Sequence, residues 1–146
     1  MRNFRLDDES GHQEALFSWA AYRTEIMPEL QYMYHVPNGG KRDAATAVAL
    51  KRQGVKAGVP DIMLPAARAG YHGLYIEPKA GKNTTTKKQK EWLEYLRQQG
   101  YYTRLLRLAA SSAADRAVFI TFRRAYKRTG NSNHALEANA GKRGKE

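Results

Sequence analysis

Two short apolar runs that carry acidic residues are the clearest hydrophobic and polar pattern in the chain. The runs cover residues 61–64 and 72–79, and their bulky aliphatic and aromatic side chains predict two strands. Side chains of a strand alternate between its two faces, so Glu77 and Lys79 project to the same side of the sheet. Asp61, at the head of the other strand, can then meet both of them. The pattern therefore predicts a group of charged side chains on the sheet.

Helical spacing and end signals predict three helices around these strands. The first starts after Ser10, the second has Asp43 as its N-cap and Gly54 as its end, and the third ends at Gly100. The three predicted helices cover residues 11–22, 44–51 and 84–100. With a last strand predicted at residues 101–108, helices and strands are interleaved, which indicates an α/β fold class.

The remaining segments are extended, turn-like or strongly basic. Pro28 closes the region of the first helix, and the sequence then predicts an extended, aromatic-rich segment at residues 30–36 and a turn at residues 37–42. A final basic helix is expected at about residues 111–127. From Gly130 onward the chain is rich in Gly, Asn, Ala and charge, so we expect one domain at residues 1–129 and a disordered basic tail at residues 130–146.

The composition is that of a globular protein with a polyanionic partner. Apolar residues make up 42% and aromatic residues 10% of the 146 positions, enough for one domain with a modest core. The 25 Lys and Arg residues against 14 Asp and Glu give a net charge of +11. Each neutralised phosphate releases counterions, so this excess favours nucleic acid as the partner, although ribosomal and membrane-surface proteins share it.

Cysteine and histidine usage limits the kinds of metal site. The chain has no cysteine, which excludes disulfides and thiolate ligands, and its four histidines are not at zinc-ligand spacing. A zinc site of the usual Cys/His type is thereby excluded. No signal peptide or apolar run of membrane-spanning length is apparent, so we expect no membrane partner and a cytoplasmic location.

The charged group on the strands has the composition of a metal-dependent nuclease site. Two carboxylates and a lysine can hold a divalent cation and a water against a phosphodiester, and the Pro78 carbonyl adds a further oxygen ligand. The alternative is that Glu77 and Lys79 are edge-strand charges that limit self-association. The apolar residues just before them, Leu74 and Ile76 among them, argue for a central strand and favour the metal site.

Two polar side chains on the predicted helices are relevant to such a site. Gln89 shares a helical stripe with Leu93 and Leu96, and a buried amide without partners costs about 1–3 kcal/mol. Gln89 is therefore expected either to tie the core together or to orient an active-site group. Glu14 flanks the apolar stripe of the first helix, where the helix dipole alone already favours a carboxylate, and His12 is expected to cap this helix or contact solvent.

Basic residues gather in the turn at residues 35–42 and at the start of the third helix. The exposed N–H groups of a glycine-rich turn suit a phosphate, and so do a helix N-terminus and its lysines. The alternative for both segments is that their basic side chains are exposed to solvent and bind no ligand. The residues expected to contact nucleic acid are Asn38, Lys41, Arg42, Lys51, Lys82, Lys87 and Lys88.

In their common order and spacing these residues resemble the VRR-NUC domain, a virus-type replication-repair nuclease branch of the PD-(D/E)xK superfamily. The resemblance runs from about His12 to Tyr102. It is carried, in chain order, by Glu14, residues 35–40 with Arg42, Leu50, Lys51, Gly54, residues 58–61 and 73–79, Gln89, Trp92, Leu96, Gly100 and Tyr101. The fold that it implies is a restriction-endonuclease-like core, in which a mixed central sheet is flanked by helices.

The resemblance also implies roles for the matching residues. The implied metal ligands are the carboxylates of Glu14, Asp61 and Glu77 and the carbonyl of Pro78. Lys79 would orient or activate the attacking water and stabilise charge in the transition state, and Gln89 would support the lysine and the water. The implied catalytic set is Glu14, Asp61, Glu77, Lys79 and Gln89, and the implied cofactor of this all-oxygen site is Mg²⁺ or Mn²⁺.

Stand-alone proteins of this size in the family are similar to phage and bacterial nucleases that act as homodimers on branched DNA, including four-way (Holliday) junctions. We therefore expect an endodeoxyribonuclease of DNA repair in a bacterial or phage-infected host cell, cleaving to leave a 5′-phosphate. Two features depart from the family pattern: Pro78 replaces an aliphatic residue, and Arg104 and Arg107 interrupt the last strand. The alternatives are a non-catalytic nucleic-acid-binding protein with a nuclease-like fold and a basic structural protein.

Overall fold

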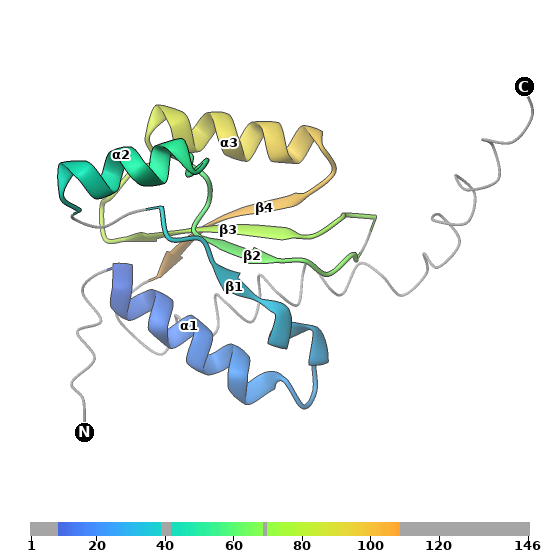
Figure 1. Ribbon diagram of the computed structural model, residues 1–146. Helices are drawn as coiled ribbons and strands as arrows, with labels where there is room; N and C mark the ends of the chain where they lie inside the picture. Colours follow the sequence, from blue (N-terminus) through green and yellow to red (C-terminus); the bar gives the residue numbers. More distant parts are fainter. Residues whose placement is uncertain (1–8, 39–41, 69, 109–146) are drawn as a thin grey trace, which may run out of the picture.

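The computed structural model describes residues 9–38, 42–68 and 70–108 (Figure 1). In chain order the helices and strands are α1 (Glu9–Arg23), the 3-10 helix η1 (Pro28–Tyr32), β1 (Tyr34–His35), α2 (Ala44–Arg52), β2 (Ile62–Leu64), β3 (Leu74–Ala80), α3 (Lys87–Gln98) and β4 (Tyr102–Leu108). The predicted final helix at about 111–127 and the predicted tail at 130–146 lie outside the described residues, as does the boundary between domain and tail.

The four strands form one mixed sheet in the order β1-β2-β3-β4. β2 is antiparallel to both β1 and β3, whereas β4 runs parallel to β3 over seven residue pairs. A parallel neighbour requires a crossover connection, and α3 supplies it between β3 and β4. Pro78 pairs with Leu106 within this parallel ladder, so the proline does not interrupt it. The expected α/β class with a mixed sheet flanked by helices is confirmed.

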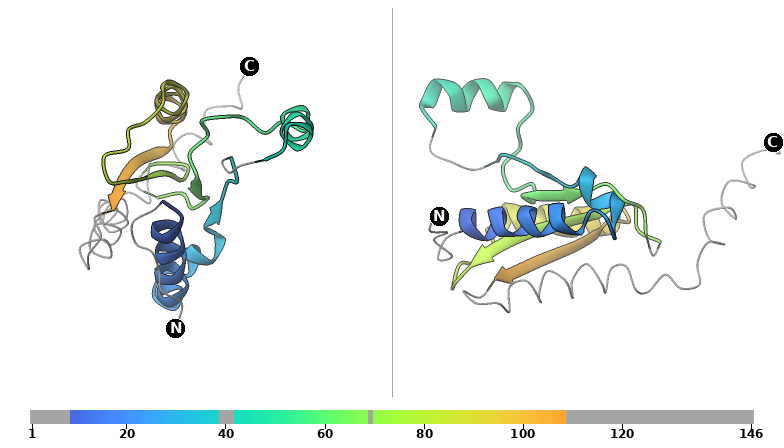
Figure 2. Two further views of the ribbon diagram at one scale, coloured as in Figure 1. Left: turned by 90° about the vertical axis from the view of Figure 1, so that its left-hand side faces the viewer. Right: turned by 90° about the horizontal axis from the view of Figure 1, so that it is seen from below.

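The two faces of the sheet are covered by different helices. Figures 1 and 2 show α1 on one side of the sheet and α3 on the other. The buried apolar core lies on the α1 side and consists of Leu16, Ala20, Leu30, Met33, Ile62, Leu64, Leu74, Ile76 and Leu106. Because side chains alternate along β3, Leu74 and Ile76 enter this core while Glu77 and Lys79 face α3. The alternation predicted from the sequence is thus the reason why a central strand can contain charged residues.

Capping side chains set the starts of α2 and α3, and the cap of α2 is the residue that the sequence predicts. The Asp43 carboxylate accepts a hydrogen bond from the Thr46 N–H at 2.9 Å, and Gly54, with φ +98°, follows the end of α2. Thr86 caps α3 in the same way. Unlike the other helices, α2 has no buried residue, and Figure 2 shows it standing away from the sheet. None of the described helices is long and apolar enough to cross a membrane.

Two expectations about the region around α1 are wrong. The segment at residues 30–36 is not extended throughout, because Pro28 begins the 3-10 helix η1 and only Tyr34 and His35 pair with β2. Proline suits the first position of such a helix, since its missing N–H would have no partner there. His12, expected to cap the helix or contact solvent, is 3% exposed, because it lies four residues before Leu16 on the face of α1 that packs on the sheet.

Candidate active site

The carboxylates of Asp61 and Glu77 come from neighbouring antiparallel segments. Ile62 pairs with Ile76, so one further step along the register sets Asp61 opposite Glu77 at the start of β2. The Glu77 side chain is fully buried, and Asp61 is half-buried. The register therefore brings together the two acidic residues that the sequence predicts as partners.

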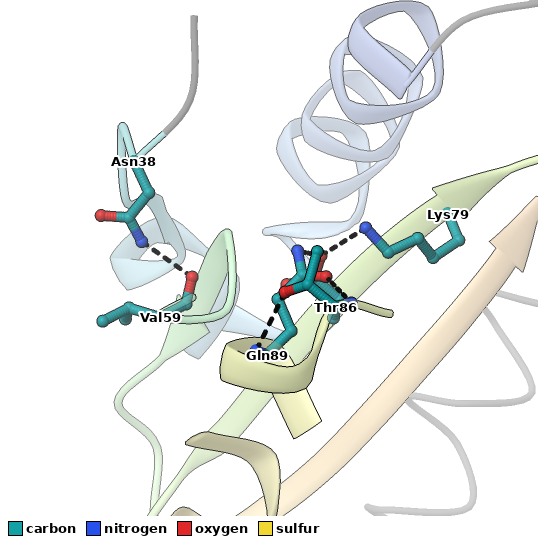
Figure 3. A network of polar contacts seen from close by, with 6 residues as sticks. Asn38, Val59, Lys79, Thr86 and Gln89 are labelled. Carbon is teal, nitrogen blue, oxygen red and sulfur yellow. Dashed lines mark hydrogen bonds and ion pairs between the residues drawn. The ribbon is translucent and has the colours of Figure 1, made fainter. Parts of the chain in front are cut away.

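Lys79 and Gln89 both donate to the same oxygen of Glu77. Lys79 Nζ lies 2.9 Å from Glu77 Oε1, and Gln89 Nε2 donates to that oxygen over 2.5 Å (Figure 3). The side chain of Lys79 is only 7% exposed, so water scarcely screens the ion pair. A buried carboxylate is costly unless it is paired and hydrogen-bonded. The two donors therefore stabilise a negative charge in the interior of the protein.

The capping box of α3 orients the Gln89 side chain. Thr86 Oγ1 accepts from the Gln89 N–H at 3.2 Å, and Gln89 Oε1 accepts from the Thr86 N–H at 2.8 Å. The helix start thus engages the amide oxygen, which leaves the amide nitrogen to donate to Glu77. The polar interruption of the apolar stripe on α3 is explained by this double contact, which joins the start of α3 to β3.

The turn after β1 holds the chain segment that leads to Asp61. The Val36 N–H donates to the Asp61 carbonyl at 2.7 Å, and His35 Nδ1 lies 2.9 Å from the same oxygen. Asn38 Nδ2 donates to the Val59 carbonyl at 2.7 Å (Figure 3). The sequence predicts that Asn38 contacts nucleic acid and assigns no individual role to His35. Both side chains hold the backbone next to Asp61, and the Pro-Asn-Gly turn that follows β1 was the available signal for such a contact.

Gly58 lets the same segment approach the start of α3. Its backbone has φ +88°, and a Cβ built there would lie 2.8 Å from the backbone carbonyl carbon of Lys88. Any larger residue would have to push the segment away from α3. Glycine at this position therefore keeps Asp61 and the first turn of α3 close together.

A cavity of about 520 Å³ opens where these elements meet. Its polar lining residues are Asn38, Asp61, Lys79, Thr86, Lys87, Lys88 and Gln89. Asp61, Lys79 and Gln89 thus reach one cavity, and Glu77 lies buried beneath it in contact with the last two. The three lysines and the N-terminus of α3 make the cavity attractive to an anion such as a phosphate.

The donor set at this cavity fits a hard divalent cation that retains several waters. Asp61 and Glu77 offer carboxylate oxygens, which are preferred ligands of Mg²⁺ and Mn²⁺, and Mg²⁺ in proteins often has only one or two carboxylate ligands. Among the described residues, no group of three or more His, Cys, Asp or Glu side chains is close enough to hold a metal ion. Glu14 is exposed on α1, which covers the other face of the sheet, so its predicted place at the metal stays a prediction. The Pro78 carbonyl likewise stays a predicted ligand.

The residues that the sequence predicts to contact nucleic acid lie in different parts of the structure. Lys87 and Lys88 line the cavity described above, while Lys51 and Arg42 line a second cavity between α2 and α3. Lys82 is exposed and lines neither of these cavities, and Lys41 lies outside the described residues.

Comparisons with known proteins agree with this architecture. The sequence profile of the VRR-NUC domain matches residues 7–110. A solved structure of a VRR-NUC domain protein superposes with a TM-score of 0.66 and 31% sequence identity, over 83% of this chain and 89% of that chain. A search of curated proteins finds no match. The profile match covers most of the chain and includes every described element, and the chain therefore belongs to the VRR-NUC domain family, a family of nucleases.

Proposed function

We propose that this protein is a metal-dependent endonuclease that hydrolyses phosphodiester bonds of DNA. One observation carries the proposal. The buried carboxylate of Glu77, opposite Asp61, receives the Lys79 ammonium and the Gln89 amide on a single oxygen next to a cavity lined by lysines. A protein that only stabilised its core would gain little from such an arrangement, because apolar residues of similar volume are often at least as stable as a buried ion pair.

The carboxylates of Asp61 and Glu77 would hold the metal ion, with Glu14 and the Pro78 carbonyl as further proposed ligands. When bound, Mg²⁺ or Mn²⁺ supplies a bound water of lowered pKa and positive charge at the phosphate. Gln89 keeps the Glu77 carboxylate in one orientation through its hydrogen bond. Lys87 and Lys88, in the first turn of α3, attract the phosphate backbone together with the helix N-terminus.

Lys79 is the residue proposed to orient the attacking water. Its ammonium lies beside Glu77 and lines the cavity, so it can orient the water and offset charge on the transition state. In the proposed reaction the water oxygen bonds to phosphorus while the bond from phosphorus to the 3′ oxygen breaks. The 3′ oxygen takes up a proton, and the other product carries a 5′-phosphate.

We further propose that the substrate is branched DNA, such as a four-way junction, and that the protein acts as a homodimer. The net charge of +11 supports a polyanionic substrate. Two symmetric incisions across a junction require two active sites related by a two-fold axis, which a dimer provides.

Cleavage assays on DNA of different structures test this function. The purified full chain is incubated with end-labelled four-way junction, flap, linear duplex and single-stranded DNA, each with Mg²⁺, with Mn²⁺ and with EDTA. Asp61→Asn removes a proposed metal ligand at nearly constant side-chain shape. Glu25→Gln is the matched control, because it makes the same kind of change at an exposed carboxylate that does not line the candidate active site. We expect metal-dependent cleavage by the parent and by Glu25→Gln, with at least about a 100-fold loss in Asp61→Asn.

Two outcomes would contradict the proposal. Cleavage that persists in EDTA, or in Asp61→Asn at the rate of the parent, would show that these carboxylates hold no catalytic metal. Tight DNA binding without cleavage of any substrate would instead identify a non-catalytic nucleic-acid-binding protein with a nuclease-like fold.

A further inference from the structure

A second and larger cavity, of about 860 Å³, lies between α2 and α3. We call it the α2–α3 groove. α2 forms one wall although none of its residues is buried, and Figure 2 shows this helix standing away from the sheet. The apolar and aromatic residues that line the groove are Ala47, Leu50, Val55, Ala57, Trp92 and Tyr95. The groove therefore combines an apolar lining with a helix that contributes little to the core.

The charged lining of the groove is almost entirely basic. It consists of Arg42, Lys51, Lys56 and Lys88 against the single carboxylate of Glu91. Such an excess of cations around an apolar cavity selects an anionic ligand that also has apolar surfaces. A basic peptide or a second copy of this basic chain would be repelled by the same charges.

Two aromatic side chains on α3 provide stacking surfaces in this groove. Trp92 and Tyr95 lie one turn apart with ring centroids 6.2 Å from each other and planes at 90°. Tyr95 is 54% exposed, so its ring is accessible to a ligand in the groove. Aromatic rings interspersed with cations are the pattern by which proteins bind unpaired nucleotides.

The groove adjoins the candidate active site. Asn38, Ala57 and Lys88 line both cavities, so the groove lies next to the cavity that contains Asp61 and Lys79. Lys88 stands at the junction, in the first turn of α3.

We propose that the α2–α3 groove binds a single-stranded segment of DNA, with bases stacked on Tyr95 and Trp92 and phosphates at Lys51 and Lys56. The groove places one unpaired strand beside the cleavage site, so among branched DNAs those with unpaired nucleotides next to the cleaved phosphate, such as a flap, fit it best. The bases of a double helix are stacked on each other and cannot stack on Tyr95 and Trp92, whereas unpaired bases can. This proposal rests on the proposed nuclease function for its role, and its binding test does not depend on cleavage.

Binding of fluorescent DNA in EDTA tests the proposal without cleavage. Anisotropy titrations compare oligo-dT with a blunt duplex of the same length. Tyr95→Ala removes the exposed ring, Tyr95→Phe retains it, and Tyr22→Ala removes an exposed tyrosine of α1 that lies outside the groove. We expect Tyr95→Ala to weaken oligo-dT binding at least about fivefold, the change that a stacking contact of about 1 kcal/mol predicts, and duplex binding by less than about twofold. Tyr95→Phe and Tyr22→Ala should bind both DNAs like the parent.

Removal of a groove cation gives an independent readout. Lys51→Ala should lower the salt dependence of oligo-dT binding by about one phosphate contact, while Lys90→Ala, at an exposed lysine of α3 that lies outside the groove, should leave it unchanged. The proposal is overturned if Tyr95→Ala binds oligo-dT as tightly as the parent, or if it weakens duplex and single strand equally. It is also overturned if Tyr95→Ala dissociates a dimer and leaves DNA binding unchanged, because a second copy would then occupy the groove.

The two proposals fail in different ways. Asp61→Asn should bind oligo-dT normally in EDTA and lose cleavage, whereas Tyr95→Ala should lose single-strand binding first. If Asp61→Asn cleaves normally while Tyr95→Ala loses oligo-dT binding, the catalytic assignment is wrong and the groove stands.

Discussion

Gln89 has two hydrogen-bonding roles that a pair of substitutions can separate. Its side-chain oxygen belongs to the capping box of α3, and its nitrogen donates to the buried Glu77. Gln89→Glu keeps an acceptor for the cap, because glutamate is as good as glutamine at this helix position, but it replaces the donor with a second carboxylate. Gln89→Met removes both side-chain contacts of Gln89 but keeps the bond from the residue 89 N–H to the Thr86 hydroxyl, whereas Thr86→Ala removes that N-cap bond alone.

The expected losses of stability follow from these contacts. Thr86→Ala should cost about 1 kcal/mol, the usual value for a lost N-cap. Gln89→Met removes the side-chain half of the capping box and a hydrogen bond to a buried charged group, so we expect about 3 kcal/mol. Gln89→Glu sets a carboxylate against Glu77, and two like charges 4 Å apart repel by about 4 kcal/mol at the effective dielectric of a protein. Gln89→Glu should therefore be at least as destabilised as Gln89→Met, although it retains the cap.

Urea denaturation in EDTA, followed by tryptophan fluorescence, measures these losses. Gln98→Glu is a matched control because Gln98 also donates to a glutamate on α3, Glu94, over 3.1 Å, but both side chains are exposed. Solvent screens that pair, so the control should lose less than about 1 kcal/mol. If Gln89→Glu is as stable as the parent, or if Gln89→Met loses no more than Thr86→Ala, then Gln89 does not contact Glu77 and the geometry of the candidate site is wrong.

Three further predictions concern the elements around the site. Lys79→Met removes the ammonium that lies beside the buried Glu77 carboxylate and should lower the unfolding free energy by about 3–5 kcal/mol in the same assay. A loss below about 1 kcal/mol would contradict a buried ion pair. The added methyl of Gly58→Ala would meet the backbone of α3, whereas that of Gly54→Ala, at a similar φ, would meet nothing within 4 Å. In urea denaturation the unfolding free energy should fall by about 1 kcal/mol for Gly54→Ala and clearly further for Gly58→Ala. Equal losses would refute the close approach of Gly58 to α3. The hydroxyl and N–H of Thr46 hold the pKa of Asp43 below its ordinary value of 3.8, so the cap is fully stabilising above that value and is lost as the pH falls through the lower folded pKa. The protection of α2 amides against exchange, corrected for the intrinsic rate at each pH, should fall on that acidification in the parent but not in Asp43→Asn, which caps without a charge, and an equal fall in both would contradict the assignment.

The proposed substrate and the local packing are connected through α2. The carboxylate cap and the basic last turn stabilise this helix by itself, since it buries none of its residues against the sheet. A helix with so little tertiary support is retained here with Lys51 and Leu50 facing the groove. Weakening the Asp43 cap should therefore reduce single-strand binding before it affects the stability of the sheet.

Local signals in the sequence were sufficient for most of the secondary structure. Asp43 and Thr86 are capping residues whose partners lie within three positions, so the starts of α2 and α3 could be predicted without any knowledge of the fold. The alternation along β3 likewise placed Glu77 and Lys79 on one face. The prediction at residues 30–36 was wrong because aromatic and apolar residues fit a strand or a 3-10 helix equally, and pairing decides between them. β2 offers only three residues, so β1 could not be longer than its partner allows.

The sequence by itself determined most of the elements, the alternating faces of β3 and the family, because these depend on periodicity, caps and a set of motifs in order. Only the tertiary structure decided that Glu77 receives Lys79 and Gln89 on one oxygen, since this contact depends on how α3 returns over β3. It also decided that His12 is buried and that Trp92 and Tyr95 line a groove with Lys51 of α2. The contact of Gln89 with Glu77, the burial of His12 and the groove each depend on packing between different elements, and the energies that select them come from packing and desolvation, which no local pattern contains.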